Sequence, residues 1–191
     1  KFNTKNCHFK FFGPYTGEVS PIFLKDIGCE YVIIGHSERR ILNKEDNKEV
    51  KLRAQSAIDA NLKVILCVGE SLIDRERKIA LEHIEKQLYE CLPNNFEHSL
   101  IAYEPIWSIG TGKIPSYYEI EEMHKHIKKI IFNLTNKNIN ILYGGSVNVE
   151  NINKILNINN VNGVLVGGAS LKVKDFLAIY TAAVKHLNNS L

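Results

Sequence analysis

The sequence predicts an α/β fold in which short apolar strands alternate with amphipathic helices. Five runs, each nearly continuously apolar over four to six residues, are rich in β-branched residues, which is typical of parallel strands covered on both faces. Between them lie segments with apolar residues at spacings of three and four. About six β-then-α units follow one another, and such units are joined by right-handed crossovers. Because no linker, low-complexity insert or composition break interrupts them, we expect a single domain over residues 1–191.

The elements can be placed in order along the chain. Ser20 followed by Pro21 is a good start for a helix over residues 20–27, since serine caps a helix and proline fits its first turn. Two further expected helices, 47–60 and 73–92, carry charged residues on their outer faces, and helices over 117–134, 149–158 and 175–187 complete the series. The expected strands span 31–35, 63–69, 100–104, 139–143 and 161–166, and residues 1–7 form one further strand.

Both an open doubly wound sheet and a closed (β/α)8 barrel fit this alternation. Polar and glycine-rich groups follow four different strands, namely His36, Glu104, residues 144–146 and residues 167–168. A barrel places its active groups at the C-terminal ends of many strands, whereas an open sheet concentrates them at one switch point. The G-T-G-K string at 110–113 has neither the third glycine of a dinucleotide motif nor Walker spacing. The distribution therefore favours the barrel and argues against a nucleotide site.

Composition excludes several classes of function. A net charge of +3 with scattered lysines gives no nucleic-acid footprint, and no apolar run approaches the roughly 18 residues that span a membrane. The four cysteines show neither C-x-x-C nor metal spacing, which indicates reduced thiols and no metal site. Because the first residue is Lys1, we expect a chain processed, trimmed or incomplete at its front. A cytoplasmic location is expected, with an organelle such as a plastid as the alternative.

A carboxylate ends the strand at 100–104 and is followed at once by a loop. The apolar approach to Glu104 predicts a partly desolvated group whose pKa rises toward that of a general base; the alternative is a solvated loop carboxylate. The loop has a stiff proline end and a flexible glycine end, and Trp107 and Ile109 would be exposed unless it packs when closed. The predicted lid consists of Pro105, Ile106, Trp107, Ser108, Ile109, Gly110, Thr111, Gly112 and Lys113.

His36 stands at another strand end, just before a polar turn or helix start. Helix N-terminal amides disfavour an imidazolium, so His36 would stay neutral and could polarise a carbonyl oxygen. The alternative is a structural histidine that caps a turn. The other six histidines lie in helical or loop segments with no partner motif, and we expect them at the surface.

Two strand-to-helix turns, at residues 144–145 and 167–168, carry paired glycines. Glycine lets backbone amides approach an anion, and the start of the next helix adds its positive end. The loops after the last two strands of a barrel often bind phosphate. Both turns together favour a phosphate site, while either alone could reflect only tight backbone geometry.

Four strings in this order resemble signatures of the triosephosphate isomerase family: GHSERR (35–40), AYEPIWSIGTGK (102–113), YGGSV (143–147) and VGGASL (166–171). Residues 13–20, GPYTGEVS, resemble its interface loop, and CVGE at 67–70 resembles another signature. The resemblance runs from about residue 1 to residue 191 and implies a TIM (β/α)8 barrel, here represented by roughly its last six βα units. Within the motifs, Ser108 stands where alanine is usual and Pro14 where the family commonly has alanine.

The resemblance implies interconversion of dihydroxyacetone phosphate and D-glyceraldehyde 3-phosphate, a step of glycolysis and gluconeogenesis, without metal or organic cofactor. By motif, Glu104 would shuttle the proton through an enediolate, neutral His36 would stabilise its oxygens and Glu38 would be a supporting carboxylate. Gly110, Ser146, Gly167 and Gly168 would bind the phosphate. A homodimer would form through the loop Gly13 to Ser20, around Thr16.

The resemblance also implies that two βα units are absent from the front of these 191 residues, with the asparagine and lysine that follow the family's first strand. We therefore expect the 191-residue chain alone to be inactive or nearly so, because that lysine stabilises developing negative charge. Two other functions fit the same residues: a non-catalytic barrel homologue that binds a phosphorylated ligand, and a different phosphosugar barrel enzyme.

Overall fold

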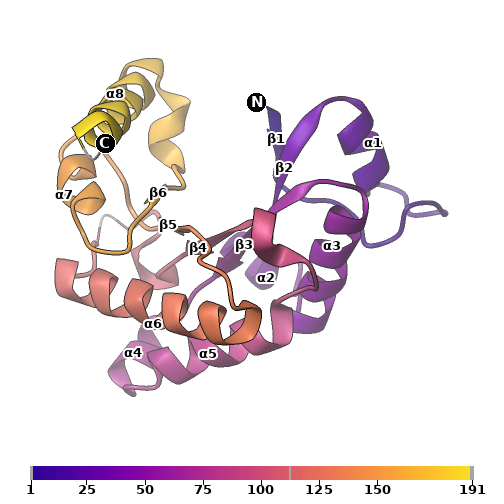
Figure 1. Ribbon diagram of the computed structural model, residues 1–191, viewed down its shortest axis with the longest axis horizontal. Coiled ribbons are helices and arrows are strands. Elements are labelled where there is room, and N and C mark those ends of the chain that lie inside the picture. The colour runs from indigo at the N-terminus through magenta and orange to yellow at the C-terminus, as the bar shows by residue number, and fades with distance from the viewer. Residues whose placement is uncertain (1, 112, 190–191) are drawn as a thin grey trace.

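The computed structural model describes residues 2–111 and 113–189, and in this part of the chain six strands form one parallel sheet (Figure 1). The strands pair in chain order, which confirms the predicted βα alternation. Lys1, the first residue of the expected leading strand, lies outside the described residues. The strands are β1 (Phe2–Thr4), β2 (Cys29–Ile34), β3 (Lys63–Val68), β4 (Leu100–Tyr103), β5 (Ile141–Tyr143) and β6 (Gly163–Val164).

Helices follow the strands and lie on the outside of the sheet (Figure 1). As predicted, Ser20 caps the first helix, where its Oγ accepts from the Ile22 amide (3.3 Å), and Pro21 begins it. The helices are α1 (Pro21–Asp26), α2 (Ser37–Leu42), α3 (Asn47–Asp59), α4 (Leu72–Glu76), α5 (Ala80–Cys91), α6 (Tyr117–Thr135), α7 (Ile152–Leu156) and α8 (Val173–Asn189). Short 3-10 helices are η1 (Phe96–His98), η2 (Ile106–Ser108) and η3 (Gly168–Leu171).

The single helix expected over residues 73–92 is wrong, because the chain forms α4 and α5 with a break between them. Lys78 adopts a left-handed conformation (φ 58°), which interrupts the helical hydrogen bonds. Ser71 and Asp74 cap α4 reciprocally, so this helix has its own start. Apolar spacing runs on through the break, and spacing alone could not reveal it.

The two faces of the sheet have different neighbours. The outward-pointing residues of the strands, such as Val32, Leu66 and Tyr103, join side chains of the helices in the main hydrophobic core. The opposite face carries a small cluster from the strands themselves, built on Ile65, Cys67 and Ala102 with half-buried neighbours. This second face is the one on which a barrel would close.

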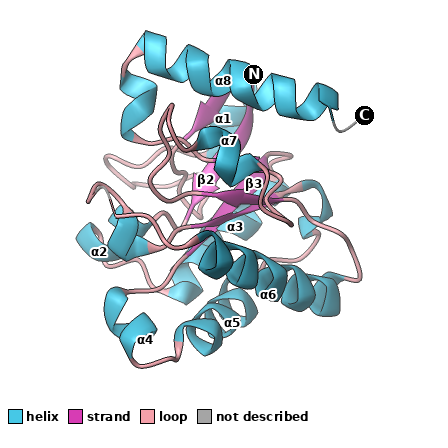
Figure 2. Cartoon of the chain, turned by 90° about the vertical axis from the view of Figure 1, so that its left-hand side faces the viewer, coloured by secondary structure: helices cyan, strands magenta, loops and turns pink. Residues whose placement is uncertain are grey.

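The sheet has β1 and β6 as its two edges, because these strands pair with one neighbour each. Figure 2 shows the strands between α8 on one side and α4, α5 and α6 on the other. The molecule is thus an open parallel half-barrel of six βα units. None of the helices that the structure describes has the length and apolar character to cross a membrane.

Candidate active site

Glu104 follows β4 directly and points onto the concave face of the sheet. Its amide donates to the Val68 carbonyl (2.8 Å), which keeps it in register with β3, and its side chain is only 2% exposed. Burial raises the pKa of the Glu104 carboxyl, against the opposing effects of His36, the Ser37 amide and the Cys67 thiol. The structure thus confirms the desolvated carboxylate expected at this strand end.

Two glycines make room for Glu104. A Cβ on Gly69 would collide with the Glu104 carbonyl, and one on Gly144 would lie 3.0 Å from Glu104 Cγ. Gly144 comes from the turn after β5, so this turn and the strand end at Glu104 lie against each other. Glycine at both positions therefore permits the packing that holds the carboxylate in place.

The structure brings His36 and Glu104 together although they follow β2 and β4, which β3 separates in the sheet. Glu104 Oε1 lies 3.2 Å from His36 Nε2, and Glu104 Oε2 accepts from the Ser37 amide (2.9 Å). His36 is the N-cap of α2, and its Nδ1 accepts from the Glu38 amide (3.3 Å). An Nδ1 that accepts leaves the proton of a neutral ring on Nε2, which faces the carboxylate.

The predicted lid begins as a packed segment and ends as an exposed one. Pro105 and Ser108 are buried and Trp107 and Ile109 are half-buried. Residues 105–109, which we call the lid root, are therefore packed in this conformation. Gly110, Thr111 and Lys113 are exposed, Gly110 has a left-handed φ of 69°, and Gly112 lies outside the described residues. The structure thus shows a packed proline end and an exposed glycine end, while the stiffness of one end and the flexibility of the other stay predictions.

The predicted phosphate-binding residues lie on neighbouring loops. Ser146 Oγ donates to the Ser108 carbonyl (2.6 Å), which ties the turn after β5 to the lid root. Gly167 and Gly168 follow β6, the neighbour of β5, and both are exposed. Apart from each glycine and its chain neighbours, no atom of the described residues lies within 4 Å of a Cβ built on Gly110, Gly167 or Gly168, so these backbones are open to approach.

Comparison with known proteins decides the family. The family model described as triosephosphate isomerase matches residues 1–183. The chain belongs to the triosephosphate isomerase family. It is 47% identical to a triosephosphate isomerase of Wolbachia sp. subsp. Brugia malayi, over 90% of this chain and 70% of that one, and 45% identical to the Ehrlichia chaffeensis protein, over 99% and 76%. It also resembles the crystal structure of Bartonella henselae triosephosphate isomerase (TM-score 0.88, 39% identity, 94% of this chain and 76% of that one).

Membership in the triosephosphate isomerase family confirms the predicted TIM-barrel fold class and makes the protein an isomerase. The chain spans 70% to 76% of the length of these relatives. The six strands of the structure agree with that share of an eight-stranded barrel.

Glu70 was not singled out as a site residue by the sequence, although it is fully buried beneath the lid root. Its Oε1 accepts from Arg75 Nε (2.7 Å), Trp107 Nε1 (3.0 Å) and the Tyr103 hydroxyl (3.0 Å). The Glu70 carbonyl also accepts from the Ile106 amide (3.1 Å). Like Glu104, Glu70 is a carboxylate just beyond a buried strand, and the same criterion could have found it.

The expectation of six surface histidines was wrong for His8 and His124, which are buried. His124 lies on α6, where its Nδ1 is 3.1 Å from the Asn160 carbonyl and its ring meets Tyr103 edge-on. Burial lowers the pKa of His124 to about 4, so the ring is neutral at physiological pH. It packs on the helix-covered side of the sheet, away from Glu104.

Proposed function

We propose that the protein interconverts dihydroxyacetone phosphate and D-glyceraldehyde 3-phosphate, with Glu104 as the base. The observation that supports this most is the buried Glu104 carboxylate 3.2 Å from His36 Nε2. A base with a raised pKa operates nearer to neutral pH, and a neutral imidazole can donate a hydrogen bond without giving up its proton. The relatives' name, triosephosphate isomerase, supports the substrate.

In the proposed reaction Glu104 removes a proton from C1 of the ketone, and the C–H electron pair moves to form a C1–C2 double bond as the carbonyl becomes an oxyanion. The hydroxyl proton on the C1 oxygen passes to the C2 oxygen, Glu104 then returns its proton to C2, and the electrons left on the C1 oxygen close a carbonyl at C1. His36 Nε2–H would donate to the oxygens of this enediolate. Both Glu104 oxygens face protein donors in this structure, so the carboxylate must leave Ser37 or His36 to reach carbon.

Glu38 would support His36 through its backbone. Its side chain is exposed, while its amide is the group that donates to His36 Nδ1. This contact fixes the ring tautomer that presents Nε2–H to substrate. We therefore assign the Glu38 position a positioning role in addition to the carboxylate role predicted by motif.

The phosphate would be held by Gly110, Ser146, Gly167 and Gly168. Open backbone at the three glycines permits amides to approach an anion, and η3 begins at Gly168. Ser146 already contacts the lid root, so phosphate binding there would be coupled to the lid. A lid closed over the enediolate would exclude water and limit loss of phosphate.

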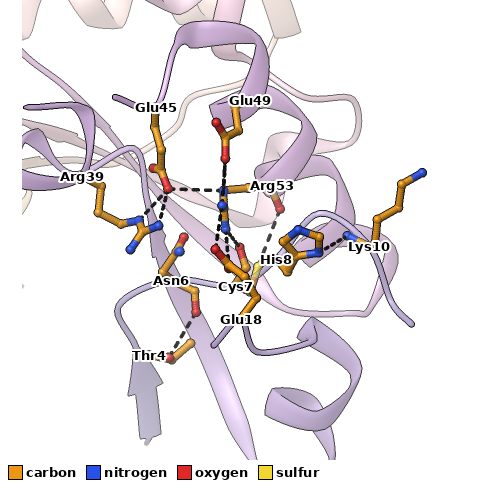
Figure 3. A network of polar contacts seen from close by, with 10 residues as sticks. All are labelled: Thr4, Asn6, Cys7, His8, Lys10, Glu18, Arg39, Glu45, Glu49 and Arg53. Atoms are coloured by element: carbon orange, nitrogen blue, oxygen red, sulfur yellow. Dashed lines mark hydrogen bonds and ion pairs between the residues drawn. The ribbon is translucent and has the colours of Figure 1, made fainter. Parts of the chain in front are cut away.

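We propose a homodimer through the loop Gly13 to Ser20, around Thr16. The loop projects from the molecule and residues 13–19 are exposed (Figure 1). Arg53 holds both of its flanks, since Nη1 donates to the Cys7 carbonyl (2.7 Å) and to Glu18 (2.9 Å) (Figure 3). The buried Glu45 in turn contacts both Arg53 and Arg39. A loop with fixed flanks and an exposed tip is suited to insertion into a second subunit.

We propose a cytoplasmic location because all four cysteines are buried thiols without disulfide bonds, as expected in a reducing compartment. We also propose that the 191 residues alone are nearly inactive, since the half-barrel leaves both sheet edges open.

Experiments on turnover therefore use what we call the extended protein. In it, the first two βα units of the Ehrlichia chaffeensis relative are fused ahead of residue 1.

The function is tested by Glu104→Asp in the extended protein. Shortening the side chain withdraws the carboxylate by about one bond, and a base misplaced by roughly 1 Å loses on the order of 10²-fold in turnover. Glu97→Asp, an exposed glutamate of η1, is the matched control and should keep full turnover. Unchanged turnover of Glu104→Asp would remove this residue as the base. Binding of phosphate ligands with no turnover in the parent would favour the non-catalytic homologue instead.

A further inference from the structure

The lid root contains a buried hydroxyl that the proposed mechanism does not use. Ser108, the last residue of η2, is 0% exposed, and its Oγ has no hydrogen-bond partner among the described residues. The same is true of the hydroxyl of Tyr143, which ends β5 and is also 0% exposed. Leaving a buried hydroxyl unpaired costs about 1–3 kcal/mol. Two such groups in one place call for an explanation.

These two hydroxyls face the same spot. A Cβ on Gly145 would collide with the Tyr143 hydroxyl and would lie 2.8 Å from Ser108 Oγ. Both hydroxyl oxygens therefore lie next to the position that a Cβ of Gly145 would occupy. Rotation about χ1 of Ser108 moves its Oγ between staggered positions without moving the backbone.

The chemistry of the two groups is complementary. Burial raises the pKa of Tyr143 to about 12 while Ser108 acts to lower it, so Tyr143 keeps its proton at neutral pH. Each hydroxyl can donate one hydrogen bond and accept others. A bond between them would satisfy both buried oxygens at once.

The backbone of Ser108 is already attached to the same turn. Its carbonyl accepts from Ser146 Oγ, three residues beyond Tyr143, at 2.6 Å. A bond from the Ser108 side chain would be a second connection between the lid root and the turn after β5. Two connections to one rigid turn hold a segment more firmly than one, because they also restrict its rotation.

We propose that the Ser108 and Tyr143 hydroxyls pair as a latch that favours the lid conformation of this structure, which makes Ser108 a positioning residue for the lid. The latch rests on the proposed function in so far as the lid serves turnover. A contact made in one lid conformation only shifts the balance between conformations by its own free energy. Loss of one neutral hydrogen bond of about 1 kcal/mol corresponds to a shift of roughly 5-fold.

The test uses Trp107, the chain's single tryptophan and the neighbour of Ser108, as a reporter of the lid root. Acrylamide quenching of its fluorescence is measured in the ligand-free 191-residue chain for Ser108→Ala, Tyr143→Phe and the double variant. We expect each single variant to increase quenching relative to the parent. The double variant should show no more quenching than either single variant, because both changes remove the same hydrogen bond. Additive effects, or no change in either single variant, would overturn the latch.

Ser56→Ala is the matched control. Ser56 lies on α3 and its Oγ is likewise buried without a partner among the described residues, but it is remote from the lid. Quenching in this variant should equal that of the parent chain. An increase as large as that in Ser108→Ala would mean that loss of any buried hydroxyl loosens the packing around Trp107, and would contradict the latch. Urea unfolding checks that each variant is folded. If Ser108→Ala does not fold, Tyr143→Phe tests the same hydrogen bond.

The quenching experiment needs no turnover, so it separates the latch from the function. In the extended protein, 2-phosphoglycolate, a phosphorylated two-carbon acid, is titrated against the same variants. If the parent turns over substrate but its lid shows no Ser108–Tyr143 coupling, the latch fails and the function stands. If the coupling is present but the parent neither binds this ligand nor turns over substrate, the proposed function fails and the latch stands.

Discussion

At the scale of single residues, the site depends on one carboxylate held where water does not reach. Glu104 is almost fully buried, yet it contacts the Ser37 amide and His36. These contacts do not offset burial, because the pKa of Glu104 remains raised. A raised pKa means that the folded state tolerates the neutral acid better than the anion. Such a cost in stability is typical of a group retained for chemistry.

This cost predicts how stability depends on pH. Because the folded pKa of Glu104 lies above its unfolded value, stability is lost as pH rises from the unfolded pKa through the folded one. Glu104→Gln removes the ionisation, so we expect this variant of the 191-residue chain to melt roughly 2–4 °C higher at pH 7. The difference should shrink toward pH 4.5. Thermal unfolding by circular dichroism measures both.

The matched control is Glu97→Gln, whose side chain is exposed on η1 and whose melting temperature should follow the parent at both pH values. A Glu104→Gln variant less stable than the parent at pH 7 would show that the contacts with His36 and Ser37 outweigh the cost of burial.

Sequence could predict the kinds of residue at the site but not their distances. A carboxylate after one strand and a histidine after another were visible as types. Their 3.2 Å separation depends on β2 and β4 flanking β3 in the folded sheet, which no local pattern encodes. The tautomer of His36 likewise depends on a contact with the Glu38 amide that exists only once α2 has formed.

At the scale of elements, the lid root is a junction of three strand ends. Glu70 after β3, Glu104 after β4 and the turn after β5 all contact residues 105–108 or the side chains beside them. Glu70 has the central place, because one of its oxygens accepts from Arg75, Tyr103 and Trp107. The start of the lid is therefore held by buried polar contacts as well as by apolar packing.

Glu70→Gln tests this junction. The variant keeps an acceptor for Trp107 and Tyr103 but removes the nearer of two carboxylate partners of Arg75, whose side chain is 14% exposed; the other, Glu119, lies 3.9 Å away. Breaking a buried ion pair from one side is strongly destabilising, and we expect a loss of about 2–4 kcal/mol in the free energy of unfolding. Urea titration followed by circular dichroism measures it.

Glu121→Gln on α6 is the comparison, since Glu121 accepts a hydrogen bond from Asn159 (2.7 Å) at a more exposed position. We expect a change below about 0.5 kcal/mol there. A Glu70→Gln effect of that small size would show that the Arg75 pair contributes little to stability.

The same scale shows why some elements were predictable and others were not. The capping signal of Ser20 and Pro21 is local, and α1 begins where it predicts. The break between α4 and α5 depends on a left-handed lysine, a residue type that rarely takes this conformation. His124 was expected at the surface because a single histidine in a polar helix gives no sign of burial; it is buried because α6 packs it against Tyr103.

At the scale of the whole molecule, six units leave surfaces that a closed barrel would cover. The concave face exposes part of Tyr31, Ile33, Leu100, Leu142 and Leu165. Beside the β6 edge, α8 presents an exposed apolar stripe at Val173, Phe176, Tyr180, Val184 and Leu187. Open strand edges and large apolar patches promote association between chains. The 191-residue chain alone should therefore be aggregation-prone.

The extended protein tests closure of the barrel. Two further βα units can pair with β1 on one side and β6 on the other, which would remove both edges and cover the concave face. We expect its isomerase turnover to exceed that of the 191-residue chain by at least about 10³-fold, because closure would also add the lysine that the family resemblance implies, which would stabilise the enediolate charge. Sedimentation should give a dimer. Intact mass verifies each species before assay, and comparable turnover by the 191-residue chain would refute the need for closure.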